Sequence, residues 1–489
     1  MRRGVAGLPL VYGPDLRHGL RLMRAPALVS TLALLTLAAC GDDAATAIDA
    51  APDAPACALA APQIAGTPPT DALADSPARC GAPAYQWRRA GVGVPGERGP
   101  RTDYSAAQLG VLAQAAGATL PSPPEHAVAI ANLSYTTQDR GALVESSTVV
   151  AFPTDLPAGV RPPLLLLLHG TSGFRHACGP TVDTQFQLLG AMLASYGWVV
   201  VTPDYLGLES VGADYPALHP YLVGEATAIA SLDAARAASQ ALVADGICAR
   251  PELAVIGGSQ GGHAALWVDR LAPYYARELE LLGTVATVPP SDLVGHSDRA
   301  LRQLVPASAN VLATLATEAP WYGKAAQLGD VLDPPWRTDV PAALEEACDP
   351  GGVVEPSALS DVFTDALLTH VATGSLATFP GFGCLFTENS LLDTSVARIT
   401  PASPSYGILF VLGEADTLVV PEIERAAYDR MCAAGVPLNY LECQGASHTR
   451  ATAWSLPEIV DFLAARRART PFVAQCTRPA ASRCRGTPP

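Results

Sequence analysis

Ser259 stands among small residues in a pattern that is typical of a serine nucleophile. The sequence there is Gly257-Gly258-Ser259-Gln260-Gly261, preceded by an apolar stretch at 253–256 that predicts a buried strand and followed by a predicted helix. A Gly-x-Ser-x-Gly turn between strand and helix strains the serine backbone and lifts its hydroxyl above the sheet edge. Glycines two residues to either side leave room for this tight turn. The pattern predicts nucleophilic chemistry at Ser259, with a plain glycine turn as the simpler alternative.

A serine hydroxyl becomes a good nucleophile only when a base takes its proton and a carboxylate orients that base. His448 stands in Gln444-Gly445-Ala446-Ser447-His448, directly after one predicted strand, and Asp416 follows another. Both lie where the carboxyl end of a strand meets its loop, at the same sheet edge as Ser259. We therefore predict a Ser259–Asp416–His448 triad. Glu414 is a competing acid, whereas Asp393 has little support from its position.

The tetrahedral oxyanion formed in acyl transfer needs two preplaced N–H donors. We expect the first to be the backbone N–H of Gln260, at the start of a helix whose dipole assists it. The second should come from the loop His169-Gly170-Thr171-Ser172-Gly173, which follows a predicted strand. We choose Thr171 over Gly170 and Ser172, and we expect His169 to brace this turn.

The remaining histidines do not indicate a metal site. None of the nine histidines forms a His-Glu-x-x-His or comparable pattern, so hydrolysis by metal-bound water is disfavoured and no cofactor is expected. Gly91-Val92-Gly93-Val94-Pro95-Gly96 formally matches a dinucleotide fingerprint, but it follows no strand, and we interpret it as a loop. His263 should pack on the helix of the nucleophile. Five further histidines have no obvious partner in the sequence: His126, His176, His219, His296 and His370.

Predicted strands and helices alternate along the part of the chain that carries these residues. The leucines at 164–168 are typical of a central strand that is covered on both faces. The alternation predicts an α/β fold with a mostly parallel, doubly wound sheet. The predicted strands are 128–135, 143–152, 164–168, 198–201, 253–256, 282–288, 408–412 and 438–441, and the predicted helices are 105–116, 185–196, 225–242 and 456–467.

Residues 290–404 break this alternation before the penultimate strand. They contain many prolines and two predicted helices, at 301–316 and 359–372. The segment is too long for a loop, and the strand ends that flank it lie at the catalytic edge of the sheet. We interpret it as a helical cap over the active site rather than a decorative subdomain. The core would then comprise 78–289 and 405–470, with a C-terminal tail at 471–489.

The first forty residues have the features of an export signal. Arg21 and Arg24 precede an apolar run at 25–39 that is too short to span a bilayer stably and ends in Leu37-Ala38-Ala39-Cys40. This ending is typical of a bacterial lipoprotein signal, whose cysteine is lipidated. We predict a signal peptide at 1–39, with Met23 as an alternative start, a lipidated Cys40 and a flexible tether to residue 77. The protein would be an exported, membrane-anchored envelope lipoprotein, with free secretion as the alternative.

Cysteine number and charge limit the cellular setting further. Eleven cysteines less Cys40 leave ten, an even number that indicates up to five disulfides in an exported protein. Pairing between neighbours is the simplest arrangement, although the sequence does not determine it: 57–80, 348–384, 432–443 and 476–484, leaving 178–248. The formal net charge of −15 disfavours a nucleic-acid partner.

Several stretches, taken in order, resemble the secretory lipase family of α/β-hydrolases, and the resemblance extends over about residues 125–467. It implies an α/β-hydrolase fold, a Ser–Asp–His triad, a helical cap and hydrolysis of carboxylic esters. The stretches are His169-Gly170-Thr171, Pro203-Asp204-Tyr205-Leu206-Gly207-Leu208, His219-Pro220-Tyr221-Leu222, Gly258-Ser259-Gln260-Gly261-Gly262, Pro289-Pro290-Ser291-Asp292-Leu293, Gly413-Glu414-Ala415-Asp416 with Val420-Pro421, and Gly445-Ala446-Ser447-His448.

Two other functions fit parts of the pattern. A serine peptidase of the prolyl-oligopeptidase type shares the motif Gly-Gly-Ser-x-Gly-Gly, but residues 41–125 are too few for the large N-terminal domain of such enzymes. A non-catalytic surface lipoprotein would use the fold as a binding module, although Ser259, Asp416 and His448 are all present. We favour a lipase or esterase that acts on a small-molecule or lipid ester through an acyl-enzyme.

Overall fold

The computed structural model describes residue 57, residues 59–65, residue 80 and residues 85–210, 215–348 and 358–488. These residues belong to one compact unit of the chain. The predicted signal peptide, Cys40 and most of the predicted tether lie outside the described residues. Within the described ranges, no helix has the length and apolarity that are needed to cross a membrane.

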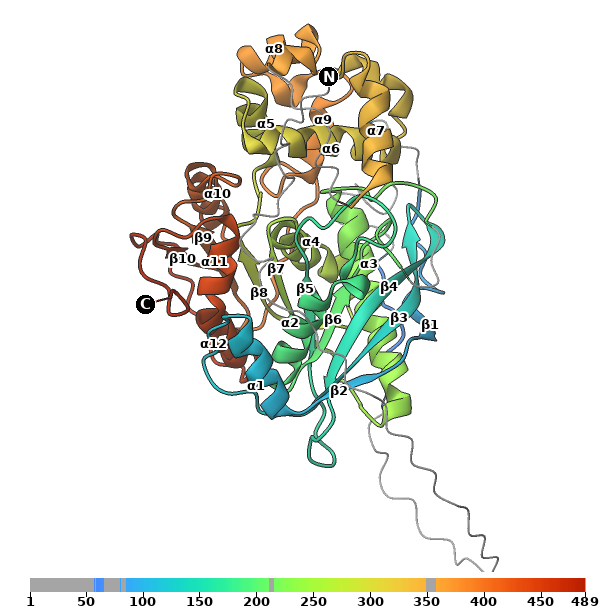
Figure 1. Ribbon diagram of the computed structural model, residues 1–489, viewed down its shortest axis with the longest axis vertical. Coiled ribbons are helices and arrows are strands. Elements are labelled where there is room, and N and C mark those ends of the chain that lie inside the picture. Colours follow the sequence, from blue (N-terminus) through green and yellow to red (C-terminus); the bar gives the residue numbers. More distant parts are fainter. Residues whose placement is uncertain are drawn as a thin grey trace, which may run out of the picture. The chain divides into compact units, whose positions relative to one another are not determined.

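A ten-stranded sheet organises these residues (Figure 1). Its strands are β1 (Val94–Arg98), β2 (Thr102–Tyr104), β3 (Val128–Asp139), β4 (Ala142–Pro153), β5 (Leu164–Leu168), β6 (Val199–Pro203), β7 (Glu252–Gly258), β8 (Glu280–Thr287), β9 (Ile408–Gly413) and β10 (Leu438–Cys443). Their order is β1-β3-β4-β6-β5-β7-β8-β9-β10, with β2 also paired to β3. The strands from β6 to β10 along this order pair in parallel, whereas β1 to β4 pair antiparallel. The sheet is therefore mostly parallel, as the alternation predicts.

Helices cover both faces of the sheet, and the leucines of β5 show why. The helices are α1 (Ala106–Ala115), α2 (Thr184–Ala194), α3 (Gly224–Ala241), α4 (Gln260–Tyr275), α10 (Pro421–Ala433), α11 (His448–Trp454) and α12 (Leu456–Arg467). Leu164, Leu166 and Leu168 pack with α3, α4 and α10, whereas Leu165 and Leu167 pack with α1, α2, α11 and α12 on the opposite face. A strand covered on both sides has no solvent-facing position, so its sequence is continuously apolar.

The segment 91–96, interpreted from the sequence as a loop, is partly a strand. Val94–Arg98 forms β1 and pairs antiparallel with β3 at the end of the sheet. An edge strand leaves alternate N–H groups unpaired, so Pro95, which has no N–H, is tolerated there. The expectation of a loop is therefore confirmed for residues 91–93 and wrong from Val94 on.

Five α-helices lie between β8 and β9 and gather together, coloured from yellow to orange in Figure 1. They are α5 (Leu293–Arg302), α6 (Pro306–Trp321), α7 (Trp336–Glu346), α8 (Asp365–Ala372) and α9 (Gly383–Asn389). The prediction of one helix over 301–316 was wrong. The helix α5 ends at Arg302, and Pro306 begins a new helix because the first helical position suits proline. The predicted helix 359–372 divides as well, because Thr364 caps α8 by accepting the N–H of Leu367.

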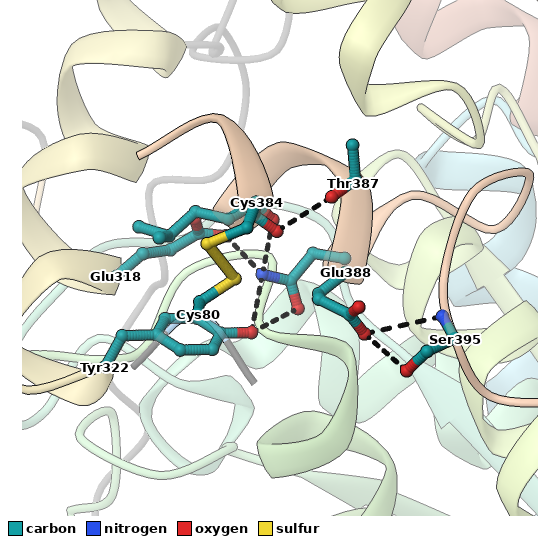
Figure 2. The surroundings of a disulfide bond; sticks show 9 residues. Cys80, Glu318, Tyr322, Cys384, Thr387, Glu388 and Ser395 are labelled. Carbon is teal, nitrogen blue, oxygen red and sulfur yellow. Dashed lines mark hydrogen bonds between the residues drawn. A yellow bond between two sulfur atoms is a disulfide. The ribbon is translucent and has the colours of Figure 1, made fainter. Parts of the chain in front are cut away.

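Disulfides join parts of the chain that are far apart in sequence, so the simple pairing between neighbours was wrong. The bonds are Cys57–Cys248, Cys80–Cys384, Cys178–Cys348, Cys432–Cys476 and Cys443–Cys484. Cysteines pair according to the positions of their β-carbons in the fold, which sequence spacing does not determine. Figure 2 shows Cys80 bonded to Cys384 of α9, beside Glu318 of α6 and Tyr322, which directly follows that helix.

Part of the segment predicted as a flexible tether packs against the core. Cys57 is bonded to Cys248, Ile64 is buried in the core, and the N–H of Ala65 donates to the carbonyl oxygen of Tyr274 at 2.7 Å. Residues 59–65 therefore contact the core and are not a free linker. The segment between Cys40 and Cys57 is the part of the predicted tether that precedes this attachment.

Candidate active site

Ser259 occupies a strained turn between β7 and α4. Its backbone has φ = 58° and ψ = −123°, and a positive φ is uncommon for a residue other than glycine. A β-carbon at Gly257 would collide with the carbonyl group of Gly261, and one at Gly261 would collide with that of Leu168. The flanking glycines are thus required by close backbone contacts, as the pattern around Ser259 predicts.

His448 bridges Ser259 and Asp416. Its Nε2 lies 2.8 Å from the Oγ of Ser259, and its Nδ1 lies 2.7 Å from the Oδ2 of Asp416. The other carboxylate oxygen accepts the N–H groups of Leu418 at 2.9 Å and Val419 at 3.0 Å, which fixes its orientation. When Nδ1–H donates to Asp416, the lone pair of Nε2 faces the serine hydroxyl and can take its proton. The structure brings together the three side chains that the sequence singles out.

The competing acids do not contact His448. Glu414 is exposed and accepts the N–H of Gly445 at 2.8 Å. Asp393 accepts a hydrogen bond from the hydroxyl of Ser390 at 2.9 Å and pairs with Arg430. Asp416 is therefore the carboxylate that is placed to orient the imidazole.

The loop that follows β5 lies against Ser259. A β-carbon built on Gly170 would be 3.6 Å from the β-carbon of Ser259. The backbone N–H of Thr171 has no acceptor among the described residues. Gln260 is the first residue of α4, so its N–H has no partner within the helix. Among the described residues, neither predicted oxyanion donor thus has an acceptor for its N–H group, and both stand in elements that meet at Ser259.

His169 braces this loop, as expected. Its ring stacks on that of Tyr205, with 4.1 Å between the centroids, and its Nδ1 lies 2.7 Å from the carbonyl oxygen of Gly170. Burial lowers the pKa of His169 to about 4, so the ring is neutral near pH 7. His263 is buried as well and donates to the carbonyl oxygen of Asn389 at 2.7 Å.

The five histidines without an obvious partner in the sequence all have one in the structure. His219 is the case that matters for the site, because its buried ring lies 2.6 Å from the side-chain nitrogen of Gln260. The sequence signal for His219 is the stretch His219-Pro220-Tyr221-Leu222, which is one of the stretches that resemble the secretory lipase family. The other pairs are His126 with Asp155, His176 with the carbonyl oxygen of Tyr215, His296 with Glu424, and His370 with Ser375.

Ser259 opens into a narrow pocket with a cavity volume of about 50 Å³. Pockets that hold drug-sized ligands measure roughly 300–1,000 Å³, so only a few atoms fit beside the serine in this conformation. Much of the wall comes from the segment between β8 and β9, through Leu293, His296, Ala307, Asn310, Val311 and Phe386. In the described part of the chain, no group of three or more His, Cys, Asp or Glu side chains is placed to hold a metal ion.

Comparison with known proteins identifies the family of this chain. A family model described as secretory lipase matches residues 175–475. The chain belongs to the secretory lipase family. The match includes the positions of Ser259, Asp416 and His448 and the whole segment between β8 and β9.

Two solved structures are similar in fold to this member of the secretory lipase family. The ligand-bound rice cell wall degrading esterase LipA from Xanthomonas oryzae is 20% identical, with a TM-score of 0.63 over 78% of this chain and 98% of that one. Candida antarctica lipase A in its closed state is 17% identical, with a TM-score of 0.60 over 80% and 86% of the two chains. The chain therefore has the α/β-hydrolase fold.

A sequence relative raises the question of activity. A protein of Mycobacterium tuberculosis (strain CDC 1551 / Oshkosh), named "probable inactive lipase", is 26% identical over 372 residues. The alignment covers 71% of this chain and 76% of that relative. Membership of the family thus does not by itself establish hydrolysis, which depends on the side chains around Ser259.

Proposed function

We propose that this protein hydrolyses carboxylic esters through an acyl-enzyme. The observation that carries the proposal is the double contact of His448, at 2.8 Å to Ser259 and 2.7 Å to Asp416. Ser259 attacks the ester carbonyl while His448 takes its proton and then returns it to the leaving alcohol. Water, activated by the same imidazole, releases the acid. Asp416 keeps the imidazole oriented and stabilises its charged form.

The N–H groups of Gln260 and Thr171 are the proposed oxyanion donors. Negative charge develops on the carbonyl oxygen only as the tetrahedral intermediate forms, so donors placed beforehand lower that barrier selectively. Gln260 also stands at the N-terminus of α4, where the helix dipole favours negative charge. Together with the triad, these donors supply what acyl transfer requires, without a metal ion in the proposed mechanism.

We propose residues 290–404 as the cap of this site, on a core of 78–289 and 405–470. Support comes from the pocket wall, since side chains of α5, α6 and α9 lie around Ser259. The family suggests a lipid ester as substrate. With a cavity volume of about 50 Å³, short acyl groups fit the present conformation, and longer ones require the cap to move.

The decisive experiment measures hydrolysis of p-nitrophenyl esters from acetate to octanoate. Ser259→Ala and His448→Ala should each lower kcat by roughly 10⁴- to 10⁶-fold. Ser239→Ala serves as a matched control, because this buried serine lies on α3 and its hydroxyl has no hydrogen-bond partner among the described residues. Activity that persists in Ser259→Ala would refute the mechanism.

The same proteins distinguish the alternative functions. A serine peptidase would turn over aminoacyl amides faster than the corresponding esters. A binding module without catalysis would fail to react with a fluorophosphonate probe, which labels an activated serine. We expect labelling of the wild type, loss of labelling in Ser259→Ala, and esters turned over faster than amides.

A further inference from the structure

We infer that residues 219–221, here called the oxyanion clamp, hold both proposed oxyanion donors in position. His219 contacts the side chain of Gln260, and Tyr221 contacts that of Thr171. The inference rests on the proposed function, because it concerns the donors that the hydrolase would use. Neither His219 nor Tyr221 belongs to the proposed triad. Both would be positioning residues, acting on the transition state through their neighbours.

His219 has the protonation state that this role requires. It is fully buried, and its Nδ1 lies 2.8 Å from the carbonyl oxygen of Leu206. Burial lowers the pKa of His219 to about 3, so the ring is neutral near pH 7 and carries one ring N–H. Because that proton is donated to Leu206, the Nε2 lone pair accepts the side-chain N–H of Gln260 at 2.6 Å.

The side chain of Gln260 depends on this contact. Gln260 is buried, with 2% of its surface exposed, and its Oε1 has no hydrogen-bond partner among the described residues. The bond to His219 is therefore the polar contact that orients the amide. Since Gln260 begins α4 directly after the strained Ser259, an anchored side chain limits rotation of its peptide and keeps its N–H directed at the site.

Tyr221 holds the second donor in a similar way. Its hydroxyl lies 2.8 Å from the Oγ1 of Thr171 and accepts the side-chain N–H of Asn310 at 3.0 Å. Thr171 and Tyr221 thus share one hydrogen bond between their hydroxyl groups, in which either oxygen can donate. The ring of Phe174, in the chain that continues from the same loop, packs edge-on against Tyr221 with 5.2 Å between the centroids.

Further contacts of His219 hold the oxyanion clamp in place. The backbone N–H of His219 donates to the carbonyl oxygen of Phe174 at 2.8 Å, and its ring lies parallel to that of Tyr205. Pro220, between the two anchors, restricts the backbone. One short segment thus contacts two proposed donors that come from different elements, the loop after β5 and the start of α4. Asn310 belongs to α6, so the proposed cap also contacts the clamp.

Steady-state kinetics can separate this role from simple substrate binding. Tyr221 also lines the pocket of Ser259, so a role in binding alone would raise KM. Oxyanion donors act when charge develops, so their displacement lowers kcat and leaves KM nearly unchanged. A boronic acid that adds to Ser259 forms a tetrahedral anion, and its inhibition constant should rise by the same factor as kcat/KM falls.

The experiment compares Tyr221→Phe, His219→Leu and His219→Gln with the wild type on p-nitrophenyl butyrate. Tyr221→Phe and His219→Leu should each lower kcat roughly 10- to 100-fold. His219→Gln keeps an acceptor for Gln260 and should recover part of that loss. Tyr196→Phe is the matched control, because its hydroxyl donates to the carbonyl oxygen of Ser122 and does not contact the site. It should change kcat by less than about twofold.

Each outcome decides the inference. A rise in KM with unchanged kcat, or losses no larger than in Tyr196→Phe, would overturn it. If His219→Leu does not fold, judged by thermal denaturation, Tyr221→Phe and His219→Gln carry the test. An active Ser259→Ala variant, or an inactive wild type, would overturn the proposed function and the clamp with it. An inactive Ser259→Ala variant combined with unaffected clamp variants would overturn the clamp alone.

Discussion

Thr287 and Thr452 join the two halves of the candidate active site by a hydrogen bond between their hydroxyl groups, with the Oγ1 atoms 2.5 Å apart. Thr287 ends β8, and its carbonyl oxygen accepts the N–H of Ser259 at 2.9 Å. Thr452 lies on α11, the helix that begins at His448. The bond therefore connects the turn of the proposed nucleophile to the helix of the proposed base.

Thr452→Val should weaken catalysis without removing it. Valine keeps the shape but loses the hydroxyl, so α11 gains freedom relative to Ser259. We expect kcat to fall several-fold with little change in KM, and the free energy of unfolding to fall by about 1 kcal/mol. Thr284→Val is the matched control, since Thr284 lies on β8, the strand of Thr287, and its hydroxyl donates to Asp269 instead of contacting α11. Equal kcat losses in the two variants would argue against a specific role for Thr452.

Asp204 should make stability depend on pH between about 4 and 7. It is fully buried, and burial raises the pKa of its carboxyl from 3.8 to about 7, against the hydrogen bonds from Ser147 and Thr181 that lower it. The folded state holds this proton up to about pH 7, whereas the unfolded chain releases it near pH 4. The stability contributed by this group is therefore complete below pH 4 and is lost as the pH rises to 7.

Asp204→Asn removes this titration. The free energy of unfolding of the variant, minus that of the wild type at the same pH, should increase from pH 4 to pH 7 by a few kcal/mol at most. Urea denaturation at each pH measures the difference. A difference that decreases over this range would mean that the hydrogen bonds from Ser147 and Thr181 outweigh burial, and that the carboxylate is held ionised.

The Cys178–Cys348 bond should restrain the segment that we propose as the cap. It connects the chain after β5 to the residues that follow α7, across a sequence separation of 170. Replacing both cysteines by serine should lower the free energy of unfolding by about 2–4 kcal/mol. The cavity beside Ser259 is narrow, so greater mobility of the helices between β8 and β9 should favour longer acyl chains. The ratio of kcat/KM for p-nitrophenyl octanoate to kcat/KM for p-nitrophenyl butyrate should therefore rise.

The Cys432–Cys476 bond is the matched control for this measurement. It connects α10 to the C-terminal tail and does not involve the segment between β8 and β9. Its removal should lower stability without changing the ratio between octanoate and butyrate. The same change of ratio in both double variants would show that general loosening, rather than release of the cap, is the cause.

Lipidation of Cys40 remains a proposal, and cell fractionation tests it. Family membership and five disulfides favour an exported protein. A lipid anchor would hold the enzyme at a membrane, because each buried methylene contributes about 0.8 kcal/mol. In a bacterial host, Cys40→Ser should move the protein from the membrane to a soluble or unprocessed form. Identical fractionation of both forms, without lipid on the N-terminal peptide, would refute the anchor but not the hydrolase.

Features with a local cause could be predicted from the sequence. The leucines of β5 identify a strand covered on both faces, and the glycines around Ser259 identify a turn that leaves no room for β-carbons. The positions of Asp416 and His448 after strand ends follow from the same kind of reasoning, because parallel strands bring their carboxyl ends to one edge. Helix boundaries in the segment between β8 and β9 were less predictable, because Pro306 and Thr364 interrupt apolar patterns that look continuous.

Only the tertiary structure decided which residues meet across long distances in the chain. Glu414 and Asp416 both closely follow β9, so Glu414 was a competing acid in the sequence, and the direction of each side chain determines which one reaches His448. The disulfide partners and the contact of His219 with Gln260 depend likewise on how loops pack over the sheet. Local sequence determines the conformation of a strand or a turn, whereas contacts between distant side chains depend on the packing of the whole chain, which no short pattern encodes.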